Sequence, residues 1–226
     1  MKGTIISIEG TDGSGKHTQQ QLLLHSLRNF KLNVFDLSFP NYDSPSSAPV
    51  KMYLSGEIGS NANCLDAYQA SSLFAIDRLC TYKKTIESHY ENGEIILLDR
   101  YVQSNFIHQC SKIDDKQEKL KFISWEENFE YDTLKLPRPD LIFFIEMPVE
   151  KSIELAHARK DYKTGKEKDI HEEDFVHLQK SYDNGLMLAK ELGWEIIHCV
   201  DENNNIRSID DIHKEIFEKT IEFLSK

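Results

Sequence analysis

Consecutive apolar residues, without regular alternation with polar ones, recur along this chain. Three such runs have the length and β-branched content of strands: Thr4–Ile8, Ile95–Leu98 and Leu141–Ile145. Asn33–Ser38 and Trp194–Val200 are weaker runs of the same kind. Strands that are apolar throughout are covered on both faces, as in a parallel sheet. The pattern therefore predicts a parallel sheet of five strands.

Between these runs, apolar residues recur at the spacing of amphipathic helices. The clearest stripe, Ile209, Ile212 and Ile216, follows Ser208, a residue type that caps helix N-termini. The predicted helices are Gln20–Arg28, Asp66–His89, Tyr101–Lys112, Val149–Arg159, Glu173–Leu192 and Ser208–Leu224. Because strands and helices alternate, we expect right-handed crossovers and helices on both faces of the sheet.

Loop composition is strongest at Asn41–Pro49, Lys160–Asp169 and Asp201–Arg207. None of these segments has the composition of a linker between domains, and 226 residues suit one α/β domain. We therefore expect residues 1–226 to form a single domain.

The charge balance limits the partners. With 27 Lys and Arg against 38 Asp and Glu, the net charge is −11, which argues against non-specific nucleic-acid binding because that requires a basic face. Phosphate ligands are still compatible with this charge, since a local cluster of cations can oppose the global sign.

The cysteines and the hydropathy bear on the compartment. Cys64, Cys80, Cys110 and Cys199 are far apart and form no C-x-x-C pair, so we expect neither a disulfide framework nor a zinc site. The N-terminus has no signal pattern, and no apolar run approaches the roughly 18 residues of a membrane span. These features predict a cytoplasmic protein.

A glycine-rich segment, GTDGSGKHT, directly follows the first predicted strand and precedes the first predicted helix. It matches the pattern G-x-x-x-x-G-K-[ST] from Gly10 to Lys16. Glycines allow the close backbone approach that phosphate binding needs, and the N–H groups at the helix start attract anions. A glycine-rich turn that binds nothing is the weaker interpretation. We expect ATP to contact Gly10, Asp12, Gly13, Ser14, Gly15, Lys16, His17 and Thr18.

His17 departs from the pattern, which has Ser or Thr at this position. The usual hydroxyl ligates Mg²⁺, a cation that prefers oxygen, and imidazole is a poor substitute. Three interpretations stay open: Thr18 or a water replaces the hydroxyl, a carboxylate such as Asp99 holds more of the metal, or the loop has lost ATP chemistry. We favour the first two, with Asp99 and Thr18 as the metal ligands.

Six segments occur in the order found in one enzyme family: IEGTDGSGKHTQ, SFPNY, SSLFAIDR, LLDRYVQSNFIHQ, RPDLIFFIEMP and a basic loop ending in KDIHEED. In these the chain resembles, over nearly its whole length, the thymidylate kinase family of nucleoside monophosphate kinases. The resemblance implies a P-loop NTPase-type three-layer α/β/α fold with a mobile lid at about residues 159–172. It also implies a homodimer and Mg²⁺-dependent transfer of the ATP γ-phosphoryl group to dTMP.

Asp99 and Arg100 follow a predicted strand at its carboxyl end, where open α/β sheets bind ligands. Asp99 is the main candidate for the Mg²⁺ shell, and Arg100 can bind a phosphate through two hydrogen bonds. In the glycine-rich loop, Lys16 would bridge the β- and γ-phosphate oxygens and is a further catalytic cation. The resemblance implies another, Arg159 of the lid. For any single lysine of this segment, a residue of a solvated charged loop is the alternative interpretation.

The resemblance also implies residues for the acceptor nucleotide. Phe74 and Arg78 lie four residues apart, on one helix face, and would stack on the base and donate to a base carbonyl. An isolated pair of this kind would more simply be a core Phe and a solvated Arg. The full set is Asp12, Phe39, Pro40, Tyr42, Phe74, Arg78, Arg100, Ser104, Asn105, His108, His171 and Glu172.

Within this set, Ser104 and Asn105 would approach the thymine edge, and Asp12 would meet the sugar 3′-OH. His108 stands where relatives often carry an aromatic side chain beside the 2′ carbon. Two alternatives to dTMP phosphorylation stay open: a kinase for another pyrimidine nucleotide, and a nucleotide-binding homologue whose catalysis is weakened by His17.

Overall fold

Five strands form the centre of the computed structural model, which describes residues 2–160 and 175–226, with the side chains of residues 156–160 outside this description. The strands are β1 (Thr4–Glu9), β2 (Val34–Ser38), β3 (Ile95–Asp99), β4 (Leu141–Glu146) and β5 (Glu195–His198). All neighbours are parallel, in the order β2-β3-β1-β4-β5. The predicted five-stranded parallel sheet is confirmed, and each strand lies where its apolar run predicted it.

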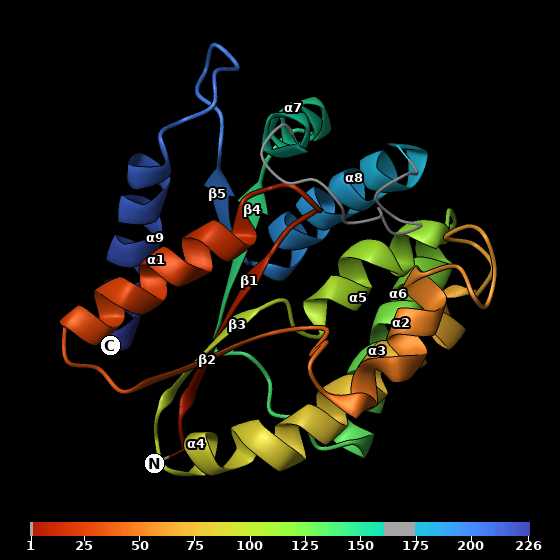
Figure 1. Ribbon diagram of the computed structural model, residues 1–226, viewed down its shortest axis with the longest axis horizontal. Helices are drawn as coiled ribbons and strands as arrows, with labels where there is room; N and C mark the ends of the chain where they lie inside the picture. The colour runs from red at the N-terminus through yellow and green to blue at the C-terminus, as the bar shows by residue number, and fades with distance from the viewer. Residues whose placement is uncertain (1, 161–174) are drawn as a thin grey trace.

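Helices cover both faces of this sheet (Figure 1). On one face lie α1 and α9, and on the other lie α3, α4, α5 and α8. The α-helices are α1 (Lys16–Asn29), α2 (Ala48–Leu54), α3 (Ala67–Thr81), α4 (Glu87–Glu91), α5 (Gln103–His108), α6 (Lys116–Glu127), α7 (Val149–Lys160), α8 (Phe175–Leu192) and α9 (Ile209–Leu224). The three-layer α/β/α arrangement is therefore as expected.

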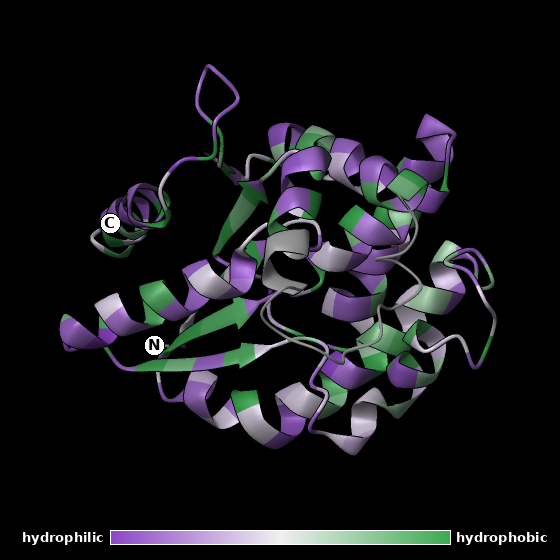
Figure 2. Ribbon diagram, turned by 45° about the horizontal axis from the view of Figure 1, so that its top comes forward, coloured by the Kyte–Doolittle hydropathy of each residue, from purple (hydrophilic) through white to green (hydrophobic). Residues whose placement is uncertain are grey.

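Alternate residues of each central strand belong to two separate cores. In β1, Ile6 and Ile8 pack with Leu23 and Leu27 of α1, whereas Ile5 packs on the opposite side against the α3–α4 and α5 layer. Figure 2 shows strands made largely of hydrophobic residues, whereas the helices around them carry hydrophobic and hydrophilic residues together. Because both sides are covered, the strands have the continuous apolar character from which they were predicted.

Two helices of the described chain, α2 and α6, were not predicted from the sequence. The loop expected at Asn41–Pro49 is wrong at its C-terminal end, where a 3-10 turn (Pro45–Ser47) leads into α2. In α6 only Phe122, Ile123 and Glu126 are buried, so no apolar stripe marks the helix. A capping signal does precede α6, since Asp115 accepts hydrogen bonds from the next turn.

The predicted helix Asp66–His89 is α3 and α4, joined by a π-helical turn (Tyr82–Ile86). A second π-helical turn, Asn128–Thr133, continues α6. The helix predicted at Tyr101–Lys112 is the short α5, followed by a 3-10 turn, Cys110–Lys112. Within the described residues, no helix has both the length and the apolar character to cross a membrane.

Candidate active site

The carboxyl ends of β2, β3 and β1 lie side by side, and the loops that follow them form the site. Asp99, the last residue of β3, is paired in register with Ile8 of β1 and with Ser38 of β2. The glycine-rich loop after β1 therefore lies beside Arg100, and both lie near the segment that begins at Phe39.

The glycine-rich loop encloses a hollow of about 560 Å³. Gly15 caps α1 in the left-handed conformation, at φ 92°. A side chain at Gly10, where φ is 150°, would come within 2.9 Å of the Ile145 carbonyl oxygen. The hollow is lined by Asp12, Gly13, Gly15, Lys16, His17, Thr18, Asp99 and Arg100. The predicted phosphate-binding residues are thus gathered at the start of a helix, where anions bind favourably; Gly10 and the buried Ser14 belong to the same loop.

Lys16 is buried in this hollow. Its Nζ donates a hydrogen bond of 2.6 Å to the Thr11 carbonyl oxygen. Burial, with the positive charge of Arg100 nearby, lowers the pKa of Lys16 to about 8. A phosphate oxygen bound in the hollow would provide a directly bonded negative partner for this ammonium group.

Asp99 meets the requirements of a magnesium ligand. Its Oδ1 is buried and accepts no hydrogen bond, and its Oδ2 lies 3.5 Å from Nδ1 of the exposed His17. No cluster of three or more His, Cys, Asp or Glu that could hold a metal occurs among the described residues. A Mg²⁺ ion bound mainly by phosphate oxygens and water needs only one or two carboxylates, so Asp99 fits this ion, and Thr18 lines the same hollow.

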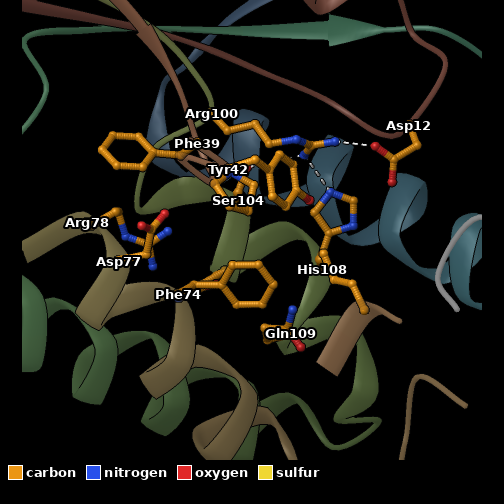
Figure 3. A pocket seen from close by; sticks show the side chains of 13 residues that line it. Asp12, Phe39, Tyr42, Phe74, Asp77, Arg78, Arg100, Ser104, His108 and Gln109 are labelled. Atoms are coloured by element: carbon orange, nitrogen blue, oxygen red, sulfur yellow. Dashed lines mark hydrogen bonds and ion pairs between the residues drawn. The ribbon is translucent and has the colours of Figure 1, made fainter. Parts of the chain in front are cut away.

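Arg100 connects the loop hollow with a neighbouring cavity. It adopts a left-handed backbone conformation, with φ 69°, which is uncommon for a residue other than glycine. Its Nη2 pairs with Asp12, and its Nη1 donates to His108 Nε2 at 3.0 Å, Ser104 Oγ at 3.3 Å and the Gly10 carbonyl oxygen at 3.2 Å. Figure 3 shows this guanidinium group between Asp12 and His108.

The neighbouring cavity, here called the second pocket, has a volume of about 570 Å³. It is lined by Asp12, Phe39, Pro40, Tyr42, Leu54, Phe74, Asp77, Arg78, Arg100, Ser104, Asn105, His108 and Gln109. Every described residue of the predicted acceptor set is present. Leu54, Asp77 and Gln109 are additions; Asp77 accepts from the Asn41 N–H at 2.8 Å and so holds the segment after Pro40.

Several predicted residues cannot be placed in this way. The lid at about residues 159–172 lies almost wholly outside the described residues, as do His171, Glu172 and the side chain of Arg159. Their contribution to the site stays a prediction.

Glu9, which sequence reasoning missed, lies fully buried beneath Arg100. It accepts hydrogen bonds of 2.6 Å from the Tyr101 N–H and from Ser104 Oγ. Ser104, expected at the thymine edge, thus donates a hydrogen bond from its hydroxyl group to Glu9. Burial raises the pKa of Glu9 to about 7, although these donors and Arg100 oppose the rise. An acidic residue at the end of an otherwise apolar strand was the signal that could have identified it.

Two further carboxylates were missed, and they hold predicted site residues. Arg78 pairs with Glu130, and Asn105 donates to Glu126. Both glutamates come from the α6 region, which the sequence did not predict as a helix.

A glycine-rich loop between a strand and a helix, with a lysine at the helix start and an aspartate on the neighbouring strand, defines the P-loop class of nucleotide-binding proteins. Within this class, the second pocket beside the loop indicates a protein that binds another ligand next to the nucleotide. The sequence model described as "Thymidylate kinase" matches residues 8–216, and the chain belongs to this family.

Curated relatives span most of the chain. The thymidylate kinase of Mycobacterium tuberculosis is 30% identical over 178 residues, which are 78% of this chain and 81% of the relative. The thymidylate kinase of Plasmodium falciparum is 29% identical over 216 residues, covering 95% and 88% of the two chains. The probable thymidylate kinase of Pyrococcus horikoshii is 28% identical over 216 residues, covering 96% and 95%.

The raised pKa of Glu9 predicts a pH dependence of stability. Between the ordinary value of 4.5 and about 7, the folded protein holds a proton that the unfolded chain releases. The free energy of unfolding therefore falls as pH rises through this range, by about 3 kcal/mol in total. Glutamine does not ionise, so we expect Glu9→Gln to abolish this contribution to the pH dependence. Urea unfolding from pH 4.5 to 8 measures the difference, with exposed Glu202→Gln as the control. If the free energy of unfolding changed with pH in the same way in wild type and Glu9→Gln, the raised pKa of Glu9 would be contradicted.

Proposed function

We propose that this protein transfers the γ-phosphoryl group of ATP to dTMP, giving dTDP and ADP. One observation carries the proposal: Arg100 and Asp12 line both the loop hollow and the second pocket. Phosphates bound in the two cavities would therefore meet at one guanidinium group. Family membership and the names of the relatives also support this reaction, and they favour it over both the weakened homologue and a kinase for another pyrimidine nucleotide.

In the loop hollow, backbone N–H groups and Lys16 would bind the β- and γ-phosphates of ATP. Asp99 and Thr18 would hold Mg²⁺, which when bound neutralises charge on the phosphates. Phosphoryl transfer requires mainly positioning and charge stabilisation, and Arg100 provides both between donor and acceptor. The acceptor phosphate is already an anion, so no general base is required. Arg159 of the lid would add positive charge over the donor phosphates.

In the second pocket, Phe74 would stack on the pyrimidine, while Arg78 and Asn105 would contact its edge. Asp12 would lie near the 3′-OH and His108 near the 2′ carbon. The acceptor phosphate would bind Arg100, beside the segment formed by Phe39, Pro40 and Tyr42. We also propose His171 and Glu172 of the lid as acceptor contacts.

We further propose a homodimer of single-domain chains in the cytoplasm. All four cysteines are free, which suits a reducing compartment.

The dimer is proposed to form through exposed apolar residues. Tyr68 and Ile76 of α3 and Leu120 of α6 are exposed, and contact between two chains through these helices would cover them. Light scattering on the purified protein is expected to give about twice the mass of one 26.2 kDa chain. A mass of one chain at micromolar concentration would contradict the dimer.

A coupled assay of ADP formation tests the reaction. With ATP and Mg²⁺, we expect rapid turnover with dTMP, little turnover with UMP, and none without an acceptor. The panel also includes dUMP and dCMP. Faster turnover with dCMP than with dTMP would indicate a kinase for another pyrimidine. Absence of turnover despite dTMP binding by calorimetry would indicate a non-catalytic homologue.

The metal assignment predicts different effects of two neighbouring substitutions. Asp99→Asn removes the charged ligand, and we expect kcat to fall by roughly 100-fold or more. His17→Ser restores the usual hydroxyl, and we expect kcat to change by less than about tenfold, since Asp99 and Thr18 already serve the metal. Steady-state kinetics over a Mg²⁺ series measures both. Normal turnover in His17→Ser from an inactive wild type would contradict the assignment.

A further inference from the structure

Two buried glutamates hold residues of the second pocket without lining it themselves. Glu126 is near the end of α6, and Glu130 lies in the π-helical turn that follows. Both side chains are 0% exposed, and neither belongs to the pocket wall. Buried carboxylates are costly unless they are well paired, so their partners indicate what they do.

Glu130 fixes the guanidinium group of Arg78. Arg78 Nε donates to Glu130 Oε2 at 2.7 Å, and Nη2 donates to Oε1. This two-point pairing determines the orientation of the planar group. Among the described residues, the remaining nitrogen, Nη1, has one partner, the Tyr101 carbonyl oxygen, at the long distance of 3.5 Å. Because Arg78 lines the second pocket, Nη1 is the donor left for a ligand.

Glu126 fixes the side-chain amide of Asn105. Asn105 Nδ2 donates to Glu126 Oε1 at 2.5 Å and, at 3.4 Å, to the Ser71 carbonyl oxygen and Glu130 Oε1. All three partners are acceptors, so the nitrogen of the amide must face them. Within the described part of the chain, no donor bonds to Oδ1. Asn105 also lines the second pocket, and Oδ1 is therefore the acceptor left for a ligand.

This arrangement does not require a charged Glu126. Two carboxylates and one guanidinium group would together carry a net negative charge in a buried site. Burial raises the pKa of Glu126 well above its ordinary range, and the neighbouring Glu130 adds to the rise. A neutral carboxylic acid still has a carbonyl oxygen that accepts from Asn105. Glutamine at this position would accept in the same way.

We propose that Glu126 is a positioning residue that determines, through Asn105, which pyrimidine the second pocket accepts. Asn105 and Arg78 both reach Glu130 Oε1, so the two side chains meet at one carboxylate oxygen, and each leaves one group for the ligand: an acceptor on Asn105 and a donor on Arg78. The matching base edge has a ring N–H beside a carbonyl, as in thymine and uracil. Cytosine has a ring acceptor beside an amino donor, and would face Asn105 and Arg78 with groups of the wrong kind.

This inference rests on the proposed kinase reaction, so wild-type activity with dTMP and dCMP is measured first. Glu126→Leu removes the acceptor and frees the amide to turn, and we expect the dTMP to dCMP ratio of kcat/KM to fall at least roughly tenfold. The fall should arise mainly through KM. Glu126→Gln is expected to keep the ratio within about threefold, because its carbonyl still accepts from Asn105.

The matched control is Glu127→Leu, the next residue, whose carboxylate pairs with Arg138 and is expected to leave the ratio unchanged. If Glu126 served only to stabilise the fold, Glu126→Leu would lower activity with both nucleotides equally. An unchanged ratio in Glu126→Leu would therefore overturn the proposal.

A second measurement uses the wild-type protein alone and does not depend on activity. In NMR spectra, the Asn105 side-chain amide is identified by its absence in Asn105→Asp. We expect its protons to be protected from solvent exchange both without ligand and with bound dTMP. Rapid exchange in the ligand-free protein would overturn the positioning role even if dTMP is phosphorylated. Failure of the kinase assay alongside a protected amide would instead reject the proposed function.

Discussion

The parallel pairing of β1 with β3 is the contact on which the site depends. Its register puts Ile8 opposite Asp99, so the glycine-rich loop and Arg100 emerge at the same level of the sheet. A shift of β3 by one residue would exchange the side chains that this strand contributes to the two cores, and would thereby disrupt the packing of both. The two hydrophobic cores therefore hold Lys16, Asp99 and Arg100 within reach of one another, although 84 positions of sequence separate the first from the last.

Beyond this register, the charged groups of the site are held by one another. Unpaired charges are costly in a buried setting, and here Asp12 pairs with Arg100 and Glu130 pairs with Arg78. Glu9 accepts hydrogen bonds from Tyr101 and Ser104. The pairs orient the side chains before any ligand binds. A ligand then meets groups whose conformational freedom is already restricted, which lowers the entropic cost of binding.

Sequence patterns predicted the parts of the structure that depend on local chemistry. The strands followed from continuous apolar runs, and the loop followed from its glycines and Lys16. Helix α6 did not, since burial of only a few of its side chains leaves no stripe. Glu126 and Glu130 are polar residues in the core, opposite to the usual trend, and only the folded chain brings them to Asn105 and Arg78. Composition gives no sign of such pairs.

The position of Glu126 has a consequence for how related enzymes are compared. None of the residues that line the second pocket lies in α6, and yet, on our proposal, that helix orients the amide that reads the base. Two homologues with identical pocket walls could then prefer different nucleobases. Substrate preference in evolution would be open to change by substitutions behind the wall, and an inhibitor matched only to the visible surface would meet different hydrogen-bonding partners in the two proteins.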